Sequence, residues 1–307
     1  MFLLAINQVV IMFTFMLVGY IMSKSGKLPE NSSKILSTVL VYICNPALSF
    51  ATQAKNVTIE NFVNQGKTIL VGAIVLGVGF VVALVLAKFF AKNEFEKGVY
   101  VYSFTISNLG YMGYPMVEAV FGSEALFHMM MFVLPMNVFI YTKGISMLSP
   151  QAGKGFKGFI TNPSIVGLFA GIIVGLSGIT LPKIVTNITT SASNCMAPLA
   201  MMMTGAIIAS KPLKELVKGV RPYLASLIRL IVIPIVALFI MVALKVPSYI
   251  TTVAVATLAM PLGLNTVVFP EAYGGDGRPG ARLAFVSHTL AIITIPMVFG
   301  LIEMFVA

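Results

Sequence analysis

Apolar stretches of about 20 residues recur along the whole chain, and the short segments between them carry most of its charges. A helix needs about 20 mostly apolar residues to cross the hydrocarbon core of a bilayer. Of the 307 residues, 58% are hydrophobic and 10% are charged, whereas soluble domains contain about 25% charged residues. So few charges cannot build a water-facing surface. The sequence therefore predicts an all-α integral membrane protein.

Ten such stretches end at charged or turn-forming residues. The predicted membrane helices cover residues 3–23, 33–53, 68–90, 98–121, 126–147, 162–180, 187–210, 222–245, 249–271 and 282–305. We expect the first to be a retained helix and not a signal peptide, because no basic segment precedes it and no cleavage site of small residues follows it. No loop is long enough for a soluble domain. We therefore expect a multi-pass protein of the cell membrane, surrounded by lipid.

Basic residues are distributed unevenly between the predicted loops. The loops on one side, beginning with the loop after the first helix, carry fifteen of the 20 lysines and arginines, and the loops on the other side carry four. Cytoplasmic loops of membrane proteins are enriched in Lys and Arg. This pattern predicts that both termini lie outside and that the basic linker, residues 149–161, is cytoplasmic. It also explains the net charge of +10 without nucleic-acid binding.

Five predicted helices lie on each side of that linker, and an odd number per half predicts two inverted repeats. Residues 1–148 would form the first repeat and residues 162–307 the second. Helix-breaking residues occupy matching places in the two halves. They are Cys44 to Leu48 with Pro46, Asn194 to Ala200 with Pro198, Asn108 to Pro115, and Pro261 to Pro270.

The fourth and ninth helices carry the chemically informative breaks. Proline removes a backbone donor and clashes with the preceding turn, so both helices can unwind within the membrane. Two broken helices that cross at the midplane bring helix N-termini together, and these favour an anion. Asn108 and Asn265 would add uncharged donors and acceptors. The alternative is that the prolines only kink the helices and the asparagines only join neighbouring helices.

Three segments carry a resemblance to a known family: Pro46-Ala47-Leu48-Ser49-Phe50, the run from Asn108 to Gly122, and the run from Pro261 to Tyr273. Together they resemble the auxin efflux carrier superfamily, which includes plant PIN-FORMED carriers and bacterial malate and malonate permeases. The short linker and the pair Asn265-Thr266 differ from the plant carriers. A small organic acid such as a dicarboxylate therefore fits better than auxin, and an auxin-like aromatic carboxylate is the alternative.

The resemblance implies where the substrate carboxylate binds, namely at the broken centres of the fourth and ninth helices. The residues that it assigns to the site are Asn108, Gly110, Gly113, Pro115, Pro261, Gly263, Asn265 and Thr266, with Pro46 and Leu48 on the facing wall. It further implies a homodimer whose first, second, sixth and seventh helices form a scaffold. Helices three to five and eight to ten would move against that scaffold as an elevator.

Few ionisable residues fall inside the predicted membrane helices, and such residues are functional candidates. Glu118 and Glu271 follow the two breaks and could bind a coupling proton or lie at a cavity rim or interface. We expect Arg229 to extend to the cytoplasmic headgroups. We expect His128 and His288 to be packed or interfacial, although a histidine can titrate near neutral pH. Whether a proton or sodium is coupled to transport stays open.

Several functions are excluded by the residues that the chain lacks. The two cysteines, Cys44 and Cys195, lie in apolar stretches and are expected to be small packing residues. One aspartate, two histidines and two cysteines supply neither an aspartyl protease pair nor a metal site. We therefore expect no cofactor, no metal and no enzymatic activity. A secondary carrier for a small organic anion is favoured over a channel and over a receptor or regulatory subunit.

Overall fold

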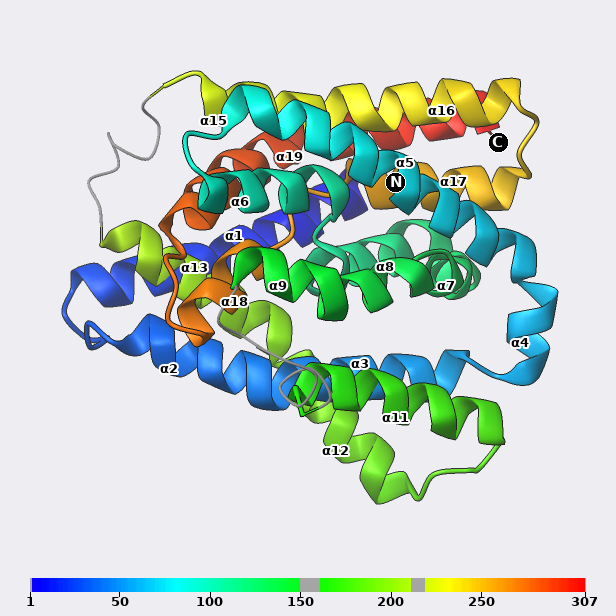
Figure 1. The fold of residues 1–307 in the computed structure, drawn as a ribbon, viewed down its shortest axis with the longest axis horizontal. Helices are drawn as coiled ribbons and strands as arrows, with labels where there is room; N and C mark the ends of the chain where they lie inside the picture. Colours follow the sequence, from blue (N-terminus) through cyan, green and yellow to red (C-terminus); the bar gives the residue numbers. More distant parts are fainter. Residues whose placement is uncertain (1, 150–160, 211–218, 307) are drawn as a thin grey trace.

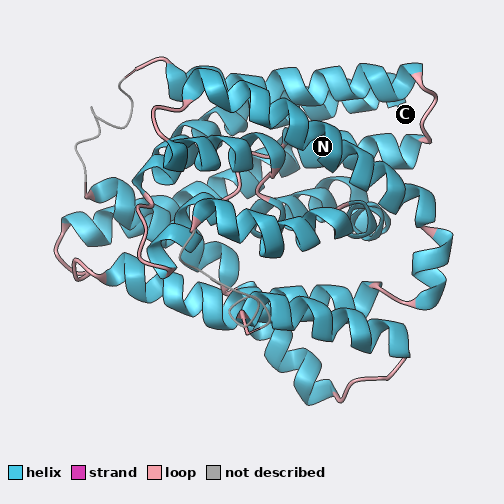
Figure 2. Cartoon of the chain, viewed as in Figure 1, coloured by secondary structure: helices cyan, strands magenta, loops and turns pink. Residues whose placement is uncertain are grey.

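The computed structural model describes residues 2–149, 161–210 and 219–306. In that part of the chain the regular elements are helices, apart from one isolated bridge between Ser107 and Leu262 (Figure 2). Most of the predicted 149–161 linker and the basic residues Lys211, Lys214 and Lys218 lie outside the described residues. In Figure 1 the C-terminus is marked near the right-hand end and the N-terminus right of centre, and the α1–α2 and α5–α6 turns lie at the left-hand end.

The first half of the chain contains most of the helix interruptions. Its elements are α1 (Phe2–Lys24), α2 (Ser32–Val39), η1 (Leu40–Cys44), α3 (Asn45–Asn56), α4 (Ile59–Asn64), α5 (Gly66–Phe90), α6 (Glu94–Thr105), η2 (Leu109–Gly113), α7 (Tyr114–Phe132), α8 (Leu134–Phe139), η3 (Ile140–Gly144) and α9 (Ile145–Leu148). The short helix α4 was not predicted. Inside α7, Gly122 has φ 88° and ψ 174°, a conformation open essentially to glycine alone, and it makes the turn between the predicted fourth and fifth helices.

The second half follows the predicted limits within a few residues. Its elements are α11 (Pro163–Ser177), α12 (Lys183–Asn194), α13 (Met196–Ala209), α15 (Arg221–Leu227), η4 (Ile228–Val232), α16 (Ile233–Ala243), α17 (Ser248–Ala259), α18 (Asn265–Ala272) and α19 (Arg278–Val306). Between α12 and α13 only Cys195 leaves the helix.

Five helical segments of the described chain are long and apolar enough to cross a membrane: Ser32–Asn56, Gly66–Phe90, Lys183–Ala209, Arg221–Ala243 and Arg278–Val306. A sixth would be the pair Leu109–Phe132 and Leu134–Leu148, bent by 49°. The ten spans remain a prediction. Several of the predicted segments are divided into pieces of about a dozen residues, and such pieces are too short to span alone.

Prolines explain three of the four π-turns in the described residues. The turns η1, η2 and η4 each end two residues before a proline, at Pro46, Pro115 and Pro234 respectively. A proline has no N–H for the preceding turn, and its ring collides with the carbonyl four residues earlier. A wider π-turn accommodates both defects. The expected break at Pro46 is therefore a widened turn within a continuous helix.

Glycines set the closest helix contacts. Gly167, Gly171 and Gly175 recur every four residues along α11 and lie against the backbone of α3, between Pro46 and Val57. Likewise Gly19 of α1 lies against Met202, and Gly205 of α13 lies against Met16. Small residues allow this approach, which drives helix association inside a bilayer. The helices thus pack closely in two pairs, α3 with α11 and α1 with α13.

We predict that Gly171→Ala lowers the stability of the protein. The added Cβ would lie 2.6 Å from the Phe50 carbonyl oxygen, and such overpacking costs about 1–3 kcal/mol. The control is Gly77→Ala on α5, where an added Cβ meets nothing within 4 Å, so stability should hold or rise. Thermal unfolding midpoints in detergent measure both, and equal midpoints would contradict the packing described for α11.

Candidate functional site

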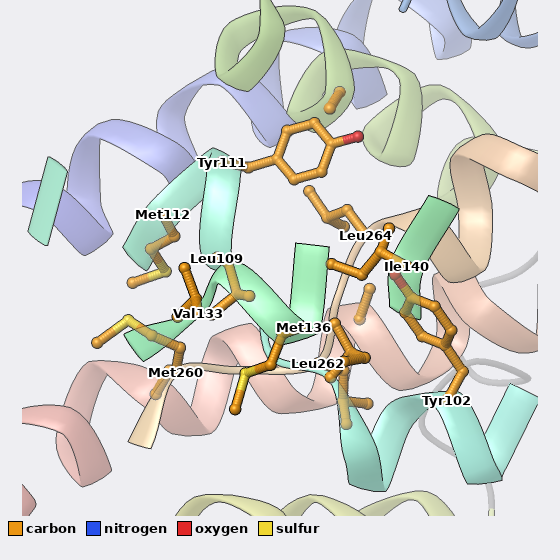
Figure 3. Close-up of a cluster of buried hydrophobic side chains, with 14 of the residues drawn as sticks. Tyr102, Leu109, Tyr111, Met112, Val133, Met136, Ile140, Met260, Leu262 and Leu264 are labelled. Carbon is orange, nitrogen blue, oxygen red and sulfur yellow. The ribbon is translucent and has the colours of Figure 1, made fainter. Parts of the chain in front are cut away.

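Two non-helical segments, far apart in the sequence, hold each other in the protein interior. Helix α6 ends at Thr105 and α17 ends at Ala259. Ser107 and Leu262 then form an antiparallel bridge, and the Asn108 N–H donates to the Pro261 carbonyl at 2.8 Å. Backbone groups away from water need such partners. Figure 3 shows Leu109, Met260, Leu262 and Leu264 together in the buried cluster around this junction.

Two asparagines beside the junction anchor its polar network. Asn265 uses both ends of its amide, because its Oδ1 accepts from the Tyr111 hydroxyl at 3.0 Å and its Nδ2 donates to the Tyr102 hydroxyl at 2.9 Å. Asn108 is only half engaged. Its Nδ2 lies 2.9 Å from the Nε2 of His288, while its Oδ1 is buried without a partner. An unpaired buried acceptor costs about 1–3 kcal/mol, so Asn108 retains bonding capacity.

A cavity of about 30 Å³ opens at this network. One wall is the start of η2, with Leu109, Gly110 and Tyr111, and another is the start of α18 with Gly263, Leu264 and Asn265. The facing wall comes from α3 and α13 and includes Leu48, Ser49, Thr52 and Met196. By this measure a water needs about 10–15 Å³. The space therefore holds about two waters and is too small for a larger molecule in this conformation.

The electrostatics of the cavity come from helix ends and not from charged side chains. None of the described residues that line it is charged. The first backbone N–H groups of a helix lack intrahelical partners and carry partial positive charge. Two such N-termini, of η2 continuing into α7 and of α18, meet at the cavity. This arrangement suits a small anion.

Comparison with known proteins identifies what this fold does. The model of the family described as membrane transport protein matches residues 4–158 and 154–299. The chain belongs to this membrane transport protein family. It is the family of the auxin efflux carriers, as the resemblance predicted. The chain is therefore a multi-pass membrane transporter and not an enzyme.

Relatives along the full length agree with the family. The transporter is 27% identical to an uncharacterized transporter of Methanocaldococcus jannaschii, over 96% of this chain and 98% of the relative. It is 22% identical to an uncharacterized transporter of Methanothermobacter thermautotrophicus, over 92% of this chain and 93% of the relative. It is also 22% identical to a Rhizobium meliloti protein named "Putative malonate transporter", over 95% of this chain and 93% of the relative.

Arg229 of the transporter lies in the interior, and the prediction that it reaches the headgroups is wrong. Its side chain is 0% exposed. It donates to the Phe104 carbonyl at 3.3 Å and to the Ser107 hydroxyl, and Ser107 in turn donates to the Thr257 carbonyl at 2.6 Å. The guanidinium therefore contacts the C-terminal, partially negative end of α6 directly and that of α17 through Ser107. Among the described residues no carboxylate forms an ion pair with it.

The structure brings half of the predicted site residues to the cavity. Leu48, Asn108, Gly110, Gly263 and Asn265 line it. The other predicted residues support the lining without reaching the cavity. Pro46 and Pro115 follow π-turns. Gly113 donates its N–H to the Asn108 carbonyl, the Pro261 carbonyl accepts from the Asn108 N–H, and the Thr266 hydroxyl donates to the Gly263 carbonyl.

The two predicted coupling carboxylates lie away from the cavity. Glu118 is exposed on α7. Glu271, at the end of α18, accepts from the Ser33 hydroxyl at 3.1 Å and from the Gly277 N–H at 3.2 Å. Glu271 therefore joins α2 to the α18–α19 turn. The role of either carboxylate in coupling remains a prediction.

Sequence reasoning missed several polar residues of the site. Tyr111, Tyr114, Tyr141 and Asn137 line the cavity, and His288 contacts it through Asn108. A usable signal was the position of Tyr111 and Tyr114 within the broken segment itself. Nothing in the local sequence marks Tyr141 or His288, which reach the site through the fold.

The remaining histidine and the cysteines lie outside the site. A ring nitrogen of His128 lies 3.1 Å from the Gln65 side-chain oxygen, and the ring packs at a tilt against Tyr249 with its centroid 4.6 Å away. Cys44 is buried, as predicted, but Cys195 is exposed in the turn between α12 and α13, so its expected packing role is wrong. Among the described residues no group of His, Cys, Asp or Glu side chains could hold a metal ion.

A second and larger hollow, of about 700 Å³, is lined by charged residues. It lies where the end of α5 and the starts of α6, α15 and α19 meet, and its lining includes Lys92, Glu96, Arg221, Arg278 and Arg282. Its basic side chains outnumber the acidic ones, Glu96 and Asp276, so this basic hollow can attract anions by charge, whereas the cavity at the junction offers oriented backbone groups. An anion would therefore be bound by charged side chains in the basic hollow and by backbone N–H groups in the cavity at the junction.

We predict that Tyr111→Phe destabilises the transporter by about 1 kcal/mol, because it removes the donor to a buried amide oxygen. Tyr42→Phe, at a side chain that is 52% exposed, is the matched control and should leave the thermal midpoint unchanged. Equal thermal midpoints for the two variants would mean that the Tyr111–Asn265 hydrogen bond contributes nothing to the stability of the protein.

Proposed function

We propose that this protein is a secondary transporter of a small organic anion, whose carboxylate binds where the two interrupted helices cross. The observation that carries the proposal is an uncharged, polar cavity bounded by two helix N-termini. Backbone N–H groups there can bind a carboxylate without a paired cation, so the anion is held but can also leave. The free bonding capacity of Asn108 supports this position for the substrate.

The substrate that fits best is a malonate-like or malate-like dicarboxylate. Hydroxyl and amide groups of Ser49, Thr52 and Asn137 line the cavity beside the helix N-termini and could bind a second polar group. The name of the Rhizobium relative points to the same class of compound. An aromatic carboxylate is the second candidate, because Tyr111, Tyr114 and Tyr141 also line the cavity and aromatic rings pack on one another.

Transport would proceed by an elevator-type form of alternating access. The cavity has one wall from α3 and α13 and the others from the crossing segments. Sliding of the crossing segments along that wall would expose the closed cavity to each side in turn. In this proposal α1–α3 and α11–α13 form the scaffold of a homodimer, and the ten helices form two inverted repeats. The termini face out and the central linker faces the cytoplasm.

A first prediction concerns substrate binding by the purified protein. Malonate or malate should raise the thermal midpoint, because a ligand at 100 times its Kd adds about 2.7 kcal/mol to the stability of the native state. The screen includes lactate, citrate, indole-3-acetate and uncharged malonamide. Asn108→Ala should lose the shift, and Asn64→Ala, at an exposed position on α4, should keep it.

Each result of this screen decides something. A shift with indole-3-acetate alone would favour the aromatic carboxylate. No shift with any acid would remove the support for organic-anion transport. Normal binding by Asn108→Ala would place the site elsewhere. In liposomes, uptake that does not saturate with concentration would indicate a channel.

A second prediction separates the two candidate anion sites. Arg229→Gln removes the buried positive charge behind Ser107 and should weaken anion binding roughly tenfold, as a loss of about 1.4 kcal/mol implies. Arg278→Gln, in the basic hollow, should leave the affinity unchanged, because the Arg278 side chain is 58% exposed and exposed charges are screened. Titration with malonate by calorimetry measures both, and the opposite order would assign the substrate to the basic hollow.

A further inference from the structure

His288 is placed to influence Asn108 directly. It lies on α19, is 1% exposed, and its Nδ1 is 2.8 Å from the Ala284 carbonyl. A carbonyl can only accept, so Nδ1 carries the proton. In the neutral ring, Nε2 is then an acceptor, and it faces the Nδ2 of Asn108 at 2.9 Å. Both ring nitrogens are satisfied in this state.

The neutral ring imposes an orientation on Asn108. Because the amide N–H must point at His288, the amide oxygen is the end left without a partner. An amide oxygen without a partner repels a carboxylate that enters the cavity. If Nε2 gains a proton, it becomes a donor, and the amide must turn so that its oxygen accepts from the ring. The Asn108 NH2 group is then the free end, and it can donate to a carboxylate.

The charged groups that face His288 from neighbouring elements decide what could compensate a proton on its ring. The charged groups on the elements that pack against α19 are Lys24 on α1, Arg221 on α15, Arg229 on η4, Glu271 on α18, and Glu94, Glu96 and Lys97 on α6. On α19 itself they are Arg278, Arg282 and Glu303; the neighbouring phenols are Tyr20, Tyr100, Tyr102, Tyr223 and Tyr249.

Among the described residues, none of these charged groups forms an ion pair with His288. Arg229 lies nearest in the network, through Ser107, the residue before Asn108. No carboxylate of the described protein therefore compensates a proton on His288. A bound anion would supply that compensation at close range.

We propose that His288 is the proton-binding site of this transporter, and that its protonation turns the Asn108 amide into a donor toward the substrate anion. One proton binds Nε2, no covalent bond changes, and the proton leaves when the anion leaves. Because each ligand stabilises the site for the other, one proton moves with each anion. This inference rests on the proposed function, since it requires an anion at the junction.

Calorimetry in two buffers of different ionisation enthalpy tests the proposal on the unaltered protein. Between about pH 6.5 and 8.5, where carboxylates stay ionised, malonate binding should take up about one proton. The affinity should fall roughly tenfold for each pH unit on the alkaline side, as one linked proton requires. Binding without proton uptake overturns the proposal and leaves the proposed function intact.

Two variants use the only two histidines of the chain. His288→Gln supplies an N–H that does not titrate, so it should bind malonate with an affinity independent of pH and without proton uptake. His128→Gln is the matched control and should keep the pH dependence. Retained pH dependence in His288→Gln overturns the proposal. No binding by the unaltered protein at any pH would instead overturn the proposed function, and this inference with it.

Discussion

The pairing of two backbone segments in the interior is the constraint on which the rest of the structure depends. Residues 106–108 and 260–264 leave their helices where the surroundings are apolar, and their polar groups need partners. The Ser107–Leu262 bridge and the Asn108–Pro261 bond supply them. Without this pairing, each interruption would leave buried backbone groups unpaired at a cost of about 1–3 kcal/mol each. With it, four helix ends are fixed around one point.

Those four ends divide into two pairs of opposite polarity. The C-termini of α6 and α17 meet at Arg229 and Ser107, whose donors bond the Phe104 and Thr257 carbonyls. The N-termini of η2 and α18 are left to the cavity. The buried guanidinium therefore neutralises the negative ends and leaves a net positive environment beside the cavity. An anion bound there completes the balance of charge. In the proposed function, selectivity for anions comes from these helix ends, because none of the described residues that line the cavity is charged.

The sequence predicted the all-helical membrane class and the position of the junction, because Gly, Pro and Asn in apolar stretches act locally. Asn108 and Asn265 were found for that reason, and Gly110 and Gly263 were found through the family resemblance. Arg229 was misplaced because an arginine two turns into a helix is consistent with a headgroup or a buried position, and only the neighbouring helix ends decide. His288 is packed in the interior, as expected, but its contact with Asn108 could not be predicted, because the two residues are 180 positions apart in the sequence. At Pro46 we expected a break in the helix and found a π-turn. The sequence shows that proline lacks a backbone N–H, but it does not show that the helix continues by widening one turn.

The central claim is that the substrate carboxylate lies between the N-termini of η2 and α18. Solid-state NMR with 13C-carboxylate malonate bound to the 15N-labelled protein tests it by measuring distances from the carboxylate to assigned nitrogens. The account predicts short distances to the backbone nitrogens of Gly110 and Leu264. Short distances to the guanidinium nitrogens of Arg221 or Arg278, with none to Gly110, would place the anion in the basic hollow and contradict the account.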